Sequence, residues 1–143
     1  MNNSIEMEKT NSLEKKEITI NSSVENLAYV EQEIEAVFDE FGISFDLFGN
    51  VLIAVTEAVT NAISYGNRND VTKQVTIQFE NKSSRLSVAV SDQGQGFDYE
   101  SLPDPTDPEN IEKLEGRGIF LMKSLSDGLS FYNEGSKVEM TFN

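Results

Sequence analysis

The chain has 143 residues, of which 38% are hydrophobic and 25% charged, as expected for one globular domain. Eleven Lys and Arg against 25 Asp and Glu give a net charge of -14, which argues against nucleic acid or an anionic membrane as a partner. The sequence has no Cys and no His, which excludes disulfides, thiol nucleophiles and histidine general bases. Catalysis would therefore depend on carboxylates, Lys, hydroxyl groups or a metal held by oxygen atoms.

The N-terminal residues show no sign of a targeting segment. Residues 1–16 are polar and aperiodic, and we expect a flexible tail followed by a single domain over 17–143. No cationic stretch precedes an apolar one, and the apolar runs look shorter than a membrane span. These features predict a cytoplasmic protein.

The predicted elements follow the order β-α-α-β-β-α-β-β. Ser22 and Glu25 have the spacing of a capping box that would begin the first helix, and Gly42 would end it. Ser44 is the expected N-cap of the second helix. The expected strands are 17–21, 73–80, 85–91, 129–133 and 137–142, and the expected helices are 22–41, 45–65 and 118–127. Short turns between strands predict an α+β fold, a two-layer α/β sandwich with a mostly antiparallel sheet and helices on one face.

The second helix carries one isolated charge. Glu57 is the only charged residue from Leu47 to Gly66, and Asn61 follows one helical turn later on the same face. One interpretation is a solvated stripe on which the two side chains bond each other. The other is a site in which Glu57 acts as a base and the Asn61 amide oxygen holds Mg²⁺.

Two glycine segments flank a long polar loop. Asp92-Gln93-Gly94-Gln95-Gly96 follows a strand, where it is either a turn or a close approach to a ligand. Gly116-Arg117-Gly118 precedes a helix, where it is either a junction or an anion site. The loop between them, about residues 98–117, contains all three prolines and is either a lid or an insertion.

Taken in order, these segments resemble the motifs of the Bergerat-type, histidine-kinase-like ATPases. Residues 57–62 look like the N box of that superfamily, 92–96 like its first glycine box and 116–118 like its second. Glu134-Gly135-Ser136-Lys137-Val138 resembles the late Gly-Thr segment. The small size and the absence of His make the chain similar to the stand-alone anti-sigma-factor serine/threonine kinases.

The resemblance implies a role for each motif residue. Glu57 would be the general base, Asn61 would ligate Mg²⁺, and Asp92 would accept a hydrogen bond from the adenine amino group of ATP. The glycines would let the chain pass close to the nucleotide, Arg117 would contact phosphate and Ser136 would support the adenine pocket. The expected nucleotide-binding residues are Asn61, Asp92, Gly94, Gly96, Gly116, Arg117, Gly118 and Ser136.

The implied function is an ATP-dependent kinase that phosphorylates a STAS-type antagonist, sequesters a sigma factor and forms a homodimer. Two departures from the family pattern leave alternatives open. Tyr65 occupies the place of the usual His, and Leu114-Glu115 replaces an Arg before the second glycine box. The alternatives are an ATP-binding regulatory module without phosphoryl transfer and an interaction domain that uses no ATP.

Overall fold

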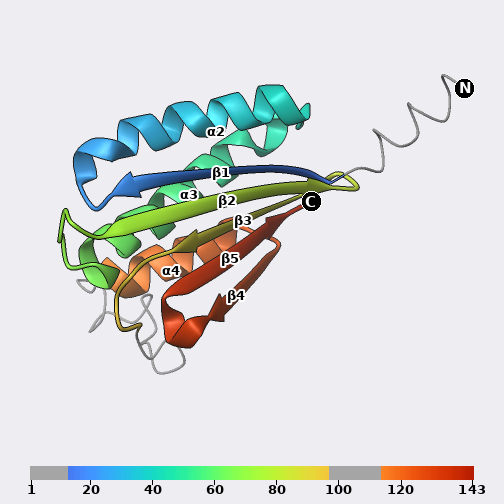
Figure 1. The fold of residues 1–143 in the computed structure, drawn as a ribbon. Coiled ribbons are helices and arrows are strands. Elements are labelled where there is room, and N and C mark those ends of the chain that lie inside the picture. Colours follow the sequence, from blue (N-terminus) through green and yellow to red (C-terminus); the bar gives the residue numbers. More distant parts are fainter. Residues whose placement is uncertain (1–12, 97–113) are drawn as a thin grey trace, which may run out of the picture.

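The fold is a two-layer α+β sandwich. The structure is a computed structural model that describes residues 13–96 and 114–143. One antiparallel sheet has the strand order β1-β2-β3-β5-β4, and the helices lie on one of its faces (Figure 1). The strands are β1 (Glu14–Asn21), β2 (Gln74–Lys82), β3 (Arg85–Ser91), β4 (Gly128–Tyr132) and β5 (Lys137–Phe142). The helices are α2 (Leu27–Phe41), α3 (Phe48–Asn61) and α4 (Leu114–Leu125). This arrangement confirms the predicted fold class and element order.

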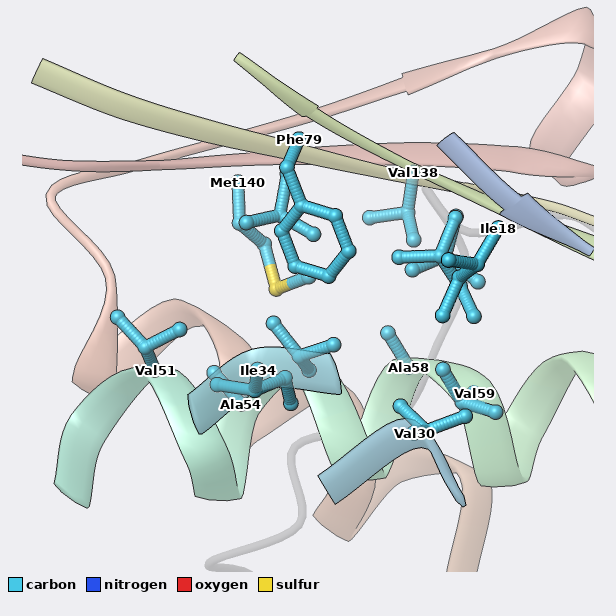
Figure 2. Close-up of a cluster of buried hydrophobic side chains, with 14 of the residues drawn as sticks. Ile18, Val30, Ile34, Val51, Ala54, Ala58, Val59, Phe79, Val138 and Met140 are labelled. Atoms are coloured by element: carbon cyan, nitrogen blue, oxygen red, sulfur yellow. The ribbon is translucent and has the colours of Figure 1, made fainter. Parts of the chain in front are cut away.

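The core lies between the sheet and the helices. Alternating residues of each strand face the helices, because successive side chains in a strand point to opposite faces. The strand register aligns one such row across the whole sheet, made of Ile18, Ile77, Val90, Val138 and Phe131. Figure 2 shows Val51, Ala54, Ala58 and Val59 of α3 packed beneath residues of the sheet, with Val30 and Ile34 of α2 beside them.

Helix α3 is the central helix of the core. With its flanking turns it spans Phe45–Gly66. The mean hydropathy of an 18-residue window in this segment is 1.4, so by length and composition alone the segment could cross a membrane. The expectation that every apolar run is too short for a membrane is therefore wrong for this segment. Its apolar residues at helical spacing are buried against the sheet, as in the core helix of a globular domain.

The first helix begins differently from the prediction. Ser23, not Ser22, is the N-cap, and its side chain accepts from the Glu25 N–H before the short 3₁₀ turn η1 (Val24–Asn26). Ser22 is fully buried and bonds another part of the chain. The sequence alone does not show which of the two adjacent serines caps the helix. In the structure Ser22 is buried, and Ser23 is left to act as the N-cap. Gly42 ends α2 with a φ of 63°, as predicted.

Two other boundaries move outward. β1 begins at Glu14, three residues before its expected start, because Lys16 pairs with Glu33 and Glu40 of α2 and extends the ladder with β2. Residues 14–16 therefore belong to β1 and not to the expected tail. Residues 1–12 of that tail lie outside the described residues. α4 begins at Leu114, so Gly116 and Gly118 lie within the helix and not before it. The rest of the expected lid, residues 98–113, lies outside the described residues.

Candidate functional site

A cavity of about 170 Å³ lies at the C-terminal end of α3. The sheet forms its floor, and α3 and α4 form its sides. Most of the lining side chains are apolar, which suits a flat organic ring. The apolar lining residues are Ala58, Ala62, Val90, Ile119, Met122, Phe131 and Val138, and the polar ones include Asn61, Tyr65, Arg68, Asp92 and Ser136.

Asp92 is the carboxylate of this cavity. It follows β3, and its Oδ1 accepts a hydrogen bond from the Gly94 N–H at 2.8 Å. No donor among the described residues reaches its Oδ2, so that oxygen can accept from a ligand. Burial raises the pKa of Asp92, while the Gly94 hydrogen bond and the charge of Lys73 act in the opposite direction. A half-buried carboxylate in an apolar cavity suits a ligand that carries an amino donor on a flat ring.

Three glycines leave room for this carboxylate and its loop. A Cβ on Gly66 would collide with the Asp92 carboxyl group, and a Cβ on Gly94 would collide with the Gly66 carbonyl. Gly96 has a φ of +82° and lies against the Glu134 carbonyl, so a side chain there would meet backbone atoms that cannot move aside. Close backbone contacts, with the Gly66 carbonyl and the Glu134 carbonyl, thus require glycine at positions 94 and 96 of the expected first glycine box.

Ser136, which the family resemblance places at the adenine pocket, lies beside Asp92. Its carbonyl accepts from the Asp92 N–H at 2.9 Å, and its hydroxyl donates to the Asn133 carbonyl at 2.9 Å. The turn that holds it between β4 and β5 is tight, with positive φ at Asn133, Glu134 and Gly135. The backbone of Ser136, more than its hydroxyl, fixes the start of the Asp92 loop.

Glu57 and Asn61 meet Gly118 across the contact between α3 and α4. A Cβ on Gly118 would lie 2.9 Å from Asn61 Nδ2, 3.2 Å from Asn61 Oδ1 and 3.2 Å from Glu57 Oε2. Gly118 is buried, so the absence of a side chain lets α4 approach both polar groups. The structure therefore brings Glu57 and Asn61 next to Gly118, which follows Glu57 by 61 positions in the chain.

A second hollow of about 320 Å³ adjoins this point on the outer side of α3 and α4. Arg117 contributes to it with Glu57 and Gly118. Asn61 and Tyr65 line both this hollow and the first cavity. Gly116 precedes Arg117 in the first turn of α4, where backbone N–H groups lack partners within the helix. The Gly116-Arg117-Gly118 segment, expected before the helix, therefore lies within the start of α4.

The described residues contain no group of three Asp, Glu, His or Cys side chains able to hold a metal ion. A metal at Asn61 would need most of its ligands from a bound molecule. The Asn61 amide and the Glu57 carboxylate are oxygen donors of the kind that Mg²⁺ accepts, and phosphate oxygens would complete the set. The residues present fit a metal that arrives with a phosphorylated ligand.

The residues that support Asp92 were not predicted as part of a site. Gly66 and Asn67 directly follow the helix expected over 45–65 and were given no role there. In the structure a π-helical turn, Ala62–Gly66, ends α3 and directs Gly66 against the Asp92 carboxyl group. A glycine five residues after Asn61 was the only available signal, since a widened turn of this kind has no clear sequence pattern.

The strand order, the helices on one face and the cavity beside Asp92 have the arrangement expected for the Bergerat class of ATP-binding domains. Comparison with known proteins narrows this further. Residues 20–142 match the family described as histidine kinase-like ATPase domain. The chain is 35% identical over 125 residues to the serine-protein kinase RsbW of Staphylococcus epidermidis, covering 82% of this chain and 79% of that protein.

Two further comparisons agree. The RsbW kinase of Staphylococcus aureus is 34% identical over 134 residues, covering 87% of this chain and 84% of that protein. The crystal structure of the RsbU and RsbW domains of a Mycobacterium tuberculosis protein matches the fold with a TM-score of 0.66 at 15% identity. That match covers 91% of this chain and 32% of the larger chain. The chain belongs to the histidine kinase-like ATPase family and, within it, to the anti-sigma-factor serine-protein kinases.

Proposed function

We propose that this kinase transfers the γ-phosphoryl group of ATP to a hydroxyl of a STAS-type antagonist and that it also sequesters a sigma factor. The observation that carries the proposal is the position of Glu57. Its carboxylate lies beside Asn61 and Gly118, and it lines the outer hollow that adjoins the nucleotide cavity. A protein substrate entering that hollow would present its hydroxyl to a carboxylate base.

In this proposal the first cavity binds the adenosine part of ATP. Asp92 Oδ2 accepts from the adenine amino group, and the apolar residues of the sheet and α4 pack on the ring. The phosphates extend past Asn61 to the first turn of α4, where Gly116, Arg117 and Gly118 lie. Mg²⁺, held by Asn61 and phosphate oxygens, would neutralise charge that develops on the phosphates.

In the transfer step one bond to the γ-phosphorus would form and another would break. The substrate hydroxyl oxygen forms a bond to the γ-phosphorus while the bond from that phosphorus to the bridging oxygen breaks. The hydroxyl proton moves to Glu57, and ADP leaves with the electron pair of the broken bond. The side chains would mainly position the reactants and stabilise charge.

The test is Glu57→Gln, which keeps the size of the side chain and removes the base. We expect ATP affinity to change little, because Glu57 does not line the first cavity. Phosphoryl transfer to a purified STAS-type antagonist should fall by roughly 10²–10⁴-fold, the usual contribution of a general base. Transfer is measured with ATP labelled in the γ-phosphoryl group.

Glu35→Gln is the matched control, since Glu35 is an exposed carboxylate on α2 outside both hollows. It should leave transfer unchanged. Full transfer by Glu57→Gln would contradict the assigned role. ATP binding by the wild-type protein without any phosphorylated antagonist would support the alternative, a nucleotide-gated regulator, which the departures at Tyr65 and Leu114-Glu115 favour.

A homodimer in the cytoplasm completes the proposal. Kinases of this group commonly act as dimers, and β1 is an edge strand whose outer side pairs with no other strand of the described residues, so a second copy could meet it there. α2 lies beside it on the helical face (Figure 1). Sedimentation at several protein concentrations would measure the state, and a monomer at all of them would contradict this part.

A further inference from the structure

Asn67 is a buried polar residue that the proposed reaction does not use. Its side chain is 1% exposed, and it follows the π-helical turn at the end of α3. A buried amide needs partners for its donors and its acceptor, or it destabilises the fold. The hydrogen-bond partners of the Asn67 side chain come from three separate parts of the chain.

Each atom of the Asn67 amide is bonded. Nδ2 donates to Ser22 Oγ at 2.6 Å and to the Gln74 carbonyl at 2.9 Å. Oδ1 accepts from the Gln93 N–H at 2.8 Å. The amide thus ties the end of β1 and the start of β2 to the residue that directly follows Asp92.

Gln93 strengthens the same connection from the other side. Its Oε1 accepts from the Gln74 N–H at 2.8 Å, so Gln74 is bonded to both Asn67 and Gln93. Gly66, the residue before Asn67, touches the Asp92 carboxyl group. The Asp92 loop is therefore held on one side by Gly66 and on the other by the Asn67 and Gln93 side chains.

We propose that Asn67, assisted by Gln93, is a positioning residue for base recognition: it sets where the Asp92 carboxylate lies in the nucleotide cavity. The inference rests on the proposed role of Asp92 as the acceptor for the adenine amino group. Asn67 does not line the cavity, so it acts on the nucleotide only through the Asp92 loop.

A double-mutant cycle on ATP affinity tests this. Wild type, Asn67→Ala, Asp92→Asn and the double variant are titrated calorimetrically with ATP and Mg²⁺. Asn67→Ala should weaken ATP binding about tenfold in the wild-type background, the effect of one lost buried hydrogen bond. In the Asp92→Asn background the same change should cost less than about twofold, because the two residues act as one unit.

Gln93→Ala provides a second variant that leaves the buried amide intact. Gln93 is exposed, and the change removes its side-chain bond to Gln74. We expect ATP binding about threefold weaker, again only where Asp92 is present. If Asn67→Ala does not fold, the effect of Gln93→Ala on ATP affinity, with and without Asp92, tests the proposal. Ile34→Val, a core change on α2 away from the cavity, controls for lost stability and should leave ATP affinity unchanged.

Equal weakening in both backgrounds, or none in either, would overturn the inference, since a purely structural role acts independently of Asp92. If Asp92→Asn alone leaves ATP affinity unchanged, the assignment of Asp92 fails and the inference fails with it. If Asp92→Asn weakens binding but neither Asn67→Ala nor Gln93→Ala is coupled to it, only the inference fails.

Discussion

The ionised Asp92 carboxylate lowers the stability of the nucleotide-free protein, because it is half-buried in the cavity. Burial raises the pKa of this carboxyl group above its ordinary 3.8. A raised pKa in the folded state means that folding favours the protonated form. Stability is therefore greatest at low pH for this group and is lost as pH rises from 3.8 through the raised value.

Asp92→Asn should remove that dependence. The amide oxygen can still accept from the Gly94 N–H, while the buried charge is gone. Without nucleotide, we expect the variant to unfold at pH 7 at a temperature equal to or above that of wild type. The difference should shrink as the pH approaches 4. Thermal unfolding across that pH range is the measurement.

Gln93→Ala serves as a comparison, since it keeps the charge of Asp92. A variant Asp92→Asn that is less stable than wild type at pH 7 would contradict the assigned cause of the shift. A more stable but weakly binding variant would be typical of a ligand site, where function is kept at a cost in stability.

Some of the residues that the structure gathers around the candidate site could be predicted from the sequence, and others could not. Glu57, Asn61 and Asp92 carry recognisable chemistry at recognisable spacing, and the structure brings Glu57 and Asn61 to the α3–α4 contact and Asp92 to the cavity. Asn67 could not be found in this way. Its partners at Ser22, Gln74 and Gln93 are far apart in the chain, and only the tertiary fold brings them to one amide.

Among the elements, the contact between α3 and α4 is the most sensitive. Gly118→Ala would place a methyl group 2.9 Å from Asn61 Nδ2 and 3.2 Å from Glu57 Oε2. Both side chains would have to move. We expect phosphoryl transfer to fall on the order of 10–100-fold, because small displacements of catalytic groups are costly. ATP affinity should fall less, and steady-state kinetics with calorimetry separate the two effects.

Gly49→Ala is the matched change in α3. Nothing lies within 4 Å of the added methyl group. It should leave transfer intact and stabilise the helix slightly, because Ala is a better helix former than Gly. Unchanged transfer in Gly118→Ala would show that the α3–α4 contact does not position Glu57 and Asn61.

Element types were predictable here, and element ends were less so. The hydrophobic periodicity of 45–65 and the alternation of 85–91 correspond to α3 and β3. The third helix was expected to begin at Gly118, after the Gly116-Arg117-Gly118 segment, whereas α4 begins at Leu114. The structure keeps two glycines inside α4, since Gly118 allows close packing against α3. Tertiary contact overrides local propensity at that position.

At the scale of the whole molecule, a protein of net charge -14 must bind an anion. Long-range attraction cannot help, and charges beyond about 8 Å are screened at physiological salt. In the proposed site the attraction would come from local groups: backbone N–H groups at the start of α4, Arg117, and a metal that neutralises phosphate. We therefore expect ATP affinity to depend strongly on Mg²⁺.

Calorimetric titration of the folded protein with ATP, with and without Mg²⁺, in wild type and Asp92→Asn would show whether the cavity at Asp92 binds ATP. We expect Mg²⁺-dependent binding by wild type that the variant weakens by roughly 10–100-fold, the cost of a lost buried acceptor. Folded wild-type protein that binds no ATP, or an Asp92→Asn variant that binds it equally well, would rule out an ATP site at Asp92.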